Sequence, residues 1–130
     1  MVTISVLAIM LTFSGGTDRT GWASQYDAGV MERTVALRQR WGQLPDDVSA
    51  WVGFVAVPEC GRIGETVYLR PLEARRWERF LVADCAGPDG SYGWMVRNRI
   101  FVEVDGATAR RWGTVGRGIR IEMMTERGTQ

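Results

Sequence analysis

The fold is decided by the stretch Phe80-Leu-Val-Ala-Asp-Cys-Ala-Gly87 and by its later counterpart Phe101-Val-Glu-Val-Asp105. Each is a short apolar strand that ends near an aspartate, Asp84 in the first and Asp105 in the second. An aspartate in this position places a carboxylate at the rim of a rigid sheet, where it can meet a ligand. Because Cys85 directly follows the first aspartate, the two stretches together indicate a small secreted barrel.

Strand patterns also dominate the rest of the chain. The expected strands are residues 21–27, 51–57, 64–70, 79–84, 99–104 and 118–123, each bounded by Gly, Pro or polar turns. Six short strands in so short a chain predict a closed barrel, because an open sheet would leave long edges unprotected. The predicted fold class is therefore all-β, a six-stranded barrel with one or two short helices.

The connecting segments have their own signals. An amphipathic helix is expected over residues 28–41 and a shorter one over 106–112, with Asp105 and Gly113 as its caps. Residues 42–50 are expected to form a surface loop and residues 88–93 a turn cluster, because both are rich in Gly, Pro and polar side chains.

Composition excludes several functional classes. A chain of 130 residues supports a single domain. Its formal net charge is only +1, and its basic residues are scattered along the sequence. That charge pattern is not the basic footprint of a nucleic-acid binder. The chain has no histidine, which excludes Ser-His-Asp and Cys-His catalysis, and two cysteines cannot make a closed structural zinc site. We therefore expect no metal, no cofactor and no nucleic acid, and we expect a monomer.

The first residues differ in character from the rest. Residues 4–13 are an apolar run that is too short to span a bilayer but suits the core of a signal peptide, and small residues follow it. We expect residues 1–16 to be a signal peptide or its remnant, residues 17–124 to be the barrel domain and residues 125–130 to be a polar tail. The alternative for the apolar run is a first buried strand. A signal peptide would place the protein outside the cytoplasm, secreted or extracytoplasmic.

The two cysteines provide a second indication of export. In an oxidising compartment, a disulfide between Cys60 and Cys85 would stabilise the fold by about 3 kcal/mol through loop closure. The alternative is a pair of buried free thiols, which behave as small apolar side chains.

The pieces taken together resemble a double-psi β-barrel of the rare lipoprotein A and expansin type, and also the barrel domain of A-type lytic transglycosylases. The resemblance covers about residues 21–123 and rests on the order and spacing of short motifs. Gly21-Trp-Ala-Ser-Gln-Tyr-Asp27 is similar to the opening motif of that group, and Val82-Ala-Asp84 to the segment before its Gly-rich loop. Val104-Asp105, with Ala109 and Gly113, is similar to its Asp-Leu-Ser helix start, although Gly106-Ala107 stands here in place of Leu-Ser.

The resemblance implies a polysaccharide-binding groove lined by acidic side chains. Asp105 and Asp27 would face this groove, and Asp84 would lie at the same rim. Without histidine, a carboxyl that is partly desolvated is the available general acid, and we expect Asp105 in that role with Asp84 or Asp27 as its partner. Each has a simpler alternative: Asp105 and Asp27 as helix caps, and Asp84 as an acceptor for loop amides.

Aromatic residues accompany the expected groove. Sugar rings stack on aromatic faces, and the candidate substrate-binding residues are Trp22, Tyr26, Tyr92 and Trp94. Core packing is the alternative for the six tryptophans. The strand residues Glu59, Glu65 and Glu103 are expected to face solvent.

The sequence thus predicts an exported domain that acts on cell-wall polysaccharide, with peptidoglycan as the expected glycan. Lytic cleavage can proceed with a single carboxyl, because the sugar's own hydroxyl serves as the nucleophile. Two alternatives remain open. One is an expansin-like module that binds glycan without cutting it, and the other is a barrel with a structural or protein-interaction role.

Overall fold

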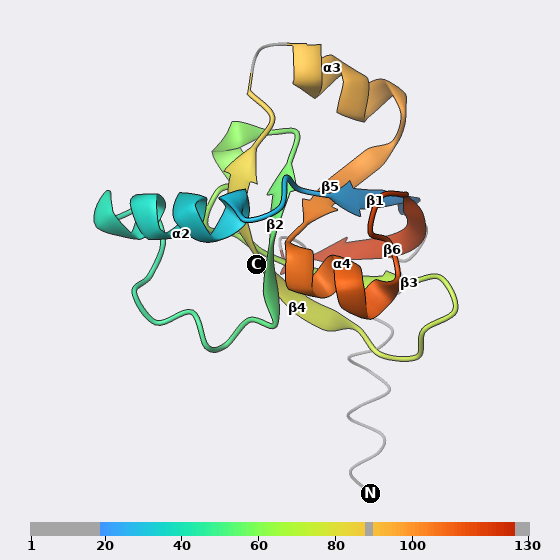
Figure 1. Cartoon of the computed structure of the whole chain (residues 1–130), viewed down its shortest axis with the longest axis horizontal. Coiled ribbons are helices and arrows are strands. Elements are labelled where there is room, and N and C mark those ends of the chain that lie inside the picture. The colour runs from blue at the N-terminus through green and yellow to red at the C-terminus, as the bar shows by residue number, and fades with distance from the viewer. Residues whose placement is uncertain (1–18, 88–89, 127–130) are drawn as a thin grey trace, which may run out of the picture.

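The computed structural model describes residues 19–87 and 90–126 of the chain, and its elements are shown in Figure 1. The strands are β1 (Thr20–Gln25), β2 (Gly53–Val57), β3 (Thr66–Pro71), β4 (Glu78–Cys85), β5 (Ile100–Val104) and β6 (Ile119–Thr125). The helices are α2 (Val30–Arg40), the 3-10 turn η1 (Cys60–Arg62), α3 (Gly90–Arg97) and α4 (Gly106–Trp112).

The six strands form a closed barrel in the order β1-β5-β2-β4-β3-β6. Two of the strand pairs, β1 with β5 and β2 with β4, run parallel, and the other four are antiparallel. Every strand therefore has two hydrogen-bonded neighbours, and no strand edge is left open. The prediction of a closed six-stranded barrel is confirmed.

The expected helices α2 and α4 are also present, but α3 is a difference from the prediction. The turn cluster expected at residues 88–93 is wrong from Gly90 onward, because α3 begins there; residues 88–89 lie outside the described residues. Gly90 and Gly93 weaken the intrinsic helical preference of this segment. Packing compensates for that weakness, since Met95 is buried beneath the helix.

Most of the two chain ends lies outside the described residues. The predicted signal peptide at residues 1–16 lies outside the described residues, as do residues 127–130 of the expected tail. Thr125 is the last residue of β6, and Glu126 accepts a hydrogen bond of 2.7 Å from the Tyr68 hydroxyl.

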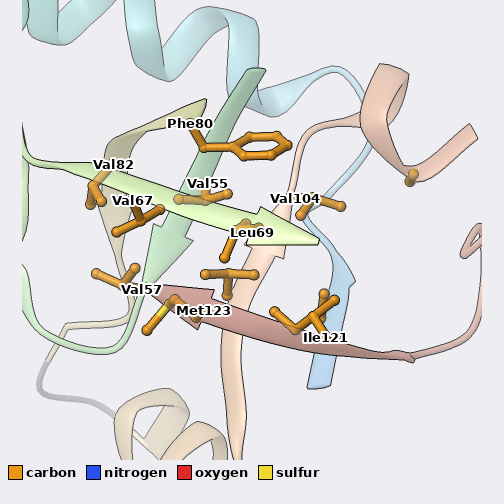
Figure 2. Close-up of a cluster of buried hydrophobic side chains, with 12 residues drawn as sticks. Val55, Val57, Val67, Leu69, Phe80, Val82, Val104, Ile121 and Met123 are labelled. Atoms are coloured by element: carbon orange, nitrogen blue, oxygen red, sulfur yellow. The ribbon is translucent and has the colours of Figure 1, made fainter. Parts of the chain in front are cut away.

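The core fills the barrel with apolar side chains from all six strands, most of them branched aliphatic, as Figure 2 shows. Its buried members include Val55, Val57, Val67, Leu69, Phe80, Val82, Val102, Val104, Ile121 and Met123. A second buried cluster lies under α2, where Leu81 and Ala83 of β4 meet Met31 and Val35. Both faces of β4 are thus covered, which explains why this strand is a continuous apolar run instead of an alternating one.

The start of β2 passes very close to the start of α4. A Cβ atom on Gly53 would lie 2.6 Å from Asp105 Oδ1 and 2.8 Å from Thr108 Oγ1. Both of those side chains are buried, so neither can move aside into solvent. Glycine at this position is therefore required by the close approach of the two elements.

We expect Gly53→Ala to destabilise the barrel by about 1–3 kcal/mol, because the added methyl group overlaps buried polar atoms. Urea unfolding followed by tryptophan fluorescence measures the change. Gly61→Ala is the matched control, since a Cβ at position 61 would meet nothing within 4 Å. Equal stability of the two variants would contradict the close approach.

Candidate functional site

A cleft of about 290 Å³ lies beside α3, where β1 and β4 end. Its walls carry three carboxylates, from Asp27, Asp84 and Glu103, together with the side chains of Tyr26 and Trp94. Two of the three aspartates proposed for the groove, Asp27 and Asp84, thus line this cleft, and Glu103 is a third acid there that was not expected.

The strand register explains how two of these acids meet. Glu103 of β5 pairs with Ser24 on one side and with Ala56 of β2 on the other, and Ala56 in turn pairs with Asp84 of β4. Residues that pair across neighbouring strands point to the same face of a sheet. Ser24, Glu103, Ala56 and Asp84 thus form one row across the barrel, and the small side chain of Ala56 separates the two acids.

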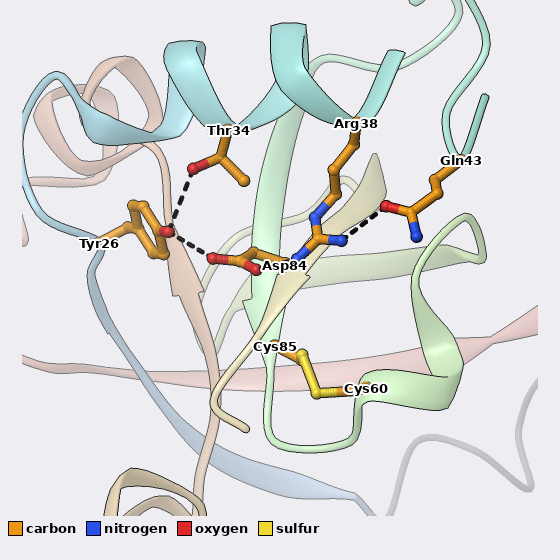
Figure 3. A network of polar contacts seen from close by, with 7 residues as sticks. All are labelled: Tyr26, Thr34, Arg38, Gln43, Cys60, Asp84 and Cys85. Carbon is orange, nitrogen blue, oxygen red and sulfur yellow. Dashed lines mark hydrogen bonds and ion pairs between the residues drawn. A yellow bond between two sulfur atoms is a disulfide. The ribbon is translucent and has the colours of Figure 1, made fainter. Parts of the chain in front are cut away.

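Asp84 is held by one cation, from Arg38 of α2, and by one hydroxyl, from Tyr26 just after β1, as Figure 3 shows. Its Oδ1 accepts a hydrogen bond of 2.7 Å from Arg38 Nη2 on α2, and its Oδ2 accepts one from the Tyr26 hydroxyl. Arg38 also donates to Gln43 Oε1 at 2.7 Å. Both oxygens of Asp84 are therefore already engaged as acceptors, and α2 is fixed against the ends of β1 and β4.

Burial and the contact with Asp84 together change the pKa of the Tyr26 hydroxyl. Burial, followed by the hydrogen bond to Asp84, raises the pKa of the Tyr26 hydroxyl to about 12. Its oxygen also lies 3.4 Å from Thr34 Oγ1 on α2. Tyr26 therefore keeps its proton at neutral pH and acts as a fixed donor to Asp84.

A disulfide fixes the end of β4 next to this network. Cys85 directly follows Asp84 and is bonded to Cys60 in η1, with the two Cα atoms 4.8 Å apart. The predicted disulfide is confirmed. Because Cys85 also lies in the wall of the cleft, the bond holds both the fold and the position of the neighbouring carboxylate.

Glu103 is the acid that sequence reasoning missed. The expectation that it faces solvent is wrong: the side chain is partly buried in the cleft. Burial raises the pKa of the Glu103 carboxyl above its ordinary value, and the negative charges of Asp27 and Asp84 raise it further. A carboxyl of this kind retains its proton at higher pH and can donate it to a bound ligand.

The structure separates the alternatives for the two remaining aspartates. Asp27 is exposed at the end of β1, and the N-cap of α2 is Gly29, without a side-chain cap, so Asp27 does not cap that helix. Asp105 is only 7% exposed and occupies the N-cap position of α4. Its Oδ1 accepts hydrogen bonds from Phe54 N at 3.2 Å and Thr108 Oγ1 at 2.7 Å. Asp105 thus joins β2 to α4 and is not one of the residues that line the cleft.

Aromatic side chains extend the cleft along β1. Trp94 also borders a second hollow, which is lined by Trp22 and Ser24. A third hollow is lined by Ser24, Tyr26 and Arg117. These three hollows follow one another along β1 and its end, and we call them together the acidic groove. Trp22 and Trp94 are 40% and 46% exposed, so each ring presents surface to a ligand, although the Arg120 guanidinium lies over one face of Trp22 at 5.2 Å. Tyr92 is exposed on α3, apart from these lining residues.

Comparison of the chain with protein-family models and with curated proteins gave no match. Within residues 19–87 and 90–126, no three His, Cys, Asp or Glu side chains are grouped so that they could hold a metal ion. In the same part of the chain, none of the helices has the length and apolar character needed to cross a membrane.

The raised pKa of Glu103 predicts a characteristic pH dependence of stability. The native state binds the Glu103 proton more tightly than the unfolded state, so this residue costs stability as the pH rises above its ordinary pKa of 4.5. We expect Glu103→Gln to gain stability relative to the wild type as the pH rises above 4.5, as measured by urea unfolding at each pH. A constant difference between the two proteins would contradict the burial of this carboxyl.

Loss of the disulfide should weaken the same end of the barrel. The bond joins residues separated by 25 positions, and the double variant Cys60→Ser, Cys85→Ser is expected to lose about 3 kcal/mol of unfolding free energy. Urea unfolding measures this loss, and the wild type treated with a reductant is the control. If neither the double variant nor the reduced wild type has a lower unfolding midpoint than the untreated wild type, the disulfide does not stabilise the fold.

Proposed function

We propose that the protein is an exported double-psi β-barrel that binds and cleaves cell-wall polysaccharide, with peptidoglycan as its substrate. The observation that carries the proposal is the acidic groove, in which Glu103, Asp27 and Asp84 lie beside the exposed rings of Trp94 and Trp22. Carboxyls flanked by exposed aromatic rings are what a glycan-cleaving site requires.

The assignment to the double-psi type is supported by topology. A closed six-stranded barrel with two parallel strand pairs, β1–β5 and β2–β4, is compatible with that arrangement. The Cys60–Cys85 disulfide supports export, because such bonds persist in oxidising compartments.

The chemistry assigns the role of general acid to Glu103. Its protonated carboxyl donates a proton to the glycosidic oxygen as the bond from that oxygen to the anomeric carbon breaks. The resulting carboxylate then takes a proton from a hydroxyl of the same sugar, whose oxygen bonds to the anomeric carbon and closes an internal ring. No water is consumed, and Glu103 regains its proton.

The neighbouring acids have different roles in this proposal. The negative charge of Asp27 stabilises the positive charge that develops on the sugar ring, while Asp84 holds Tyr26 and Arg38 in place. Asp105, the general acid expected from the family resemblance, is not used, because its carboxylate bonds to Phe54 and Thr108.

Incubation with purified peptidoglycan tests the proposal. The wild type is expected to release soluble muropeptides that carry the internal sugar ring, as identified by mass spectrometry. Glu103→Gln should lower the release rate about a hundredfold or more, as expected for loss of a general acid. Glu73→Gln makes the same change at an exposed position outside the groove and should leave the rate unchanged.

The remaining variants separate the alternatives. A folded Asp105→Asn protein that loses release while Glu103→Gln keeps it would return the role of acid to Asp105. Binding of peptidoglycan without release would identify a non-catalytic glycan-binding module. If the wild type neither binds nor cleaves, the barrel has a structural or interaction role.

A further inference from the structure

A separate hollow of about 200 Å³ shares a wall with the acidic groove. Ser91 and Trp94 of α3 border the groove. Val96 of the same helix and Arg99, two residues after its end, border the hollow, and Met95 contributes to both. The helix α3 thus separates two depressions on the same side of the barrel. We call the hollow of about 200 Å³ the arginine pocket.

The lining of the arginine pocket is positively charged. Three arginines contribute to it, Arg19, Arg62 and Arg99, against one acid, Glu59. Arg62 is already compensated, since it lies 3.7 Å from Glu59 and 3.1 Å from Glu65. Among the described residues, Arg19 and Arg99 make no ion pair, so two positive charges remain without a counter-charge.

Both arginines lie over the Phe101 ring of the barrel. The guanidinium carbon of Arg19 is 5.4 Å from the centre of that ring, and the guanidinium carbon of Arg99 is 5.3 Å from it. Arg99 Nη2 also donates a hydrogen bond of 2.6 Å to the Thr20 carbonyl oxygen. Because these two contacts restrict the Arg99 side chain before any ligand arrives, it loses little freedom when it binds an anion.

The floor of the pocket is apolar. Met95, Ile100 and Met123 are buried there beside Phe101. A volume of about 200 Å³ is smaller than the roughly 300–1,000 Å³ of pockets that enclose a whole drug-sized ligand. The ligand that fits these features is the end of a chain with a carboxylate for the arginines and a small apolar side chain for the floor.

We infer that the arginine pocket binds the C-terminal carboxylate of a short peptide that ends in small apolar residues, namely the stem peptide of peptidoglycan. This inference rests on the proposed function for the identity of the substrate. Stem peptides branch from the glycan and end in D-alanine, which combines a methyl group with a carboxylate. A glycan in the acidic groove would lie across α3 from the pocket that receives its peptide.

Calorimetric titration of the full chain with diacetyl-L-lysyl-D-alanyl-D-alanine tests the inference. We expect this peptide to bind at least tenfold more tightly than its C-terminal amide, because the amide lacks the charge that pairs with arginine. Arg99→Gln should weaken binding of the acid form by about tenfold, and Arg19→Gln, which removes no main-chain contact, should do the same. Arg75→Gln changes an exposed arginine outside the pocket and should have no effect.

The outcomes that overturn the inference are distinct. Equal binding of the acid and the amide, unchanged binding by both pocket variants, or no binding at all would remove the peptide site. Equally tight binding of inorganic phosphate would reduce it to a general anion site. Tighter binding of the L-alanyl-L-alanine isomer would point to the C-terminus of a protein instead.

The titration uses no glycan, so it is independent of the cleavage assay. If muropeptides are released but the peptide does not bind, only the arginine pocket is wrong. If the peptide binds but no glycan is cleaved or bound, the proposed function is wrong while the pocket still holds a carboxylate.

Discussion

Closure of the barrel through the pairing of β1 with β6 is the constraint on which the rest of the structure depends. Closure gives every strand two neighbours and so fixes the register around the whole ring. The parallel pairs then bring the ends of strands that are distant in sequence to one side of the barrel. The row from Ser24 to Asp84 follows from that register, and the acidic groove lies over this row.

Much of this arrangement follows from local sequence patterns, and the rest depends on what covers each strand. The strands were predictable because short apolar runs bounded by Gly and Pro have few alternatives in a small chain. The disulfide was predictable because the chain has two cysteines and other signs of export. Glu103 alternates with apolar neighbours, which is also the pattern of a solvent-facing residue. The residues that surround Glu103 distinguish the two cases, and they come from α3 and from the ends of β1 and β4. The glycines of α3 concealed that helix in the sequence.

The predicted aspartates show the same limit. Asp27, Asp84 and Asp105 each lie at or just after the end of a strand, so the local sequence pattern predicts the same rim position for all three. Contacts across the barrel give them different surroundings: Arg38 and Tyr26 engage Asp84, and the close approach of Gly53 encloses Asp105. Those contacts join residues far apart in the chain, and no local pattern contains them. A strand-end aspartate therefore indicates a rim position, and its partners decide its use.

The helix α3 occupies the connection between β4 and β5 and contributes side chains to both the groove and the arginine pocket. The helix takes part in none of the six strand pairings. Changes of the exposed side chains on this eight-residue helix therefore alter the lining of both depressions while the hydrogen-bonded ring of strands stays the same.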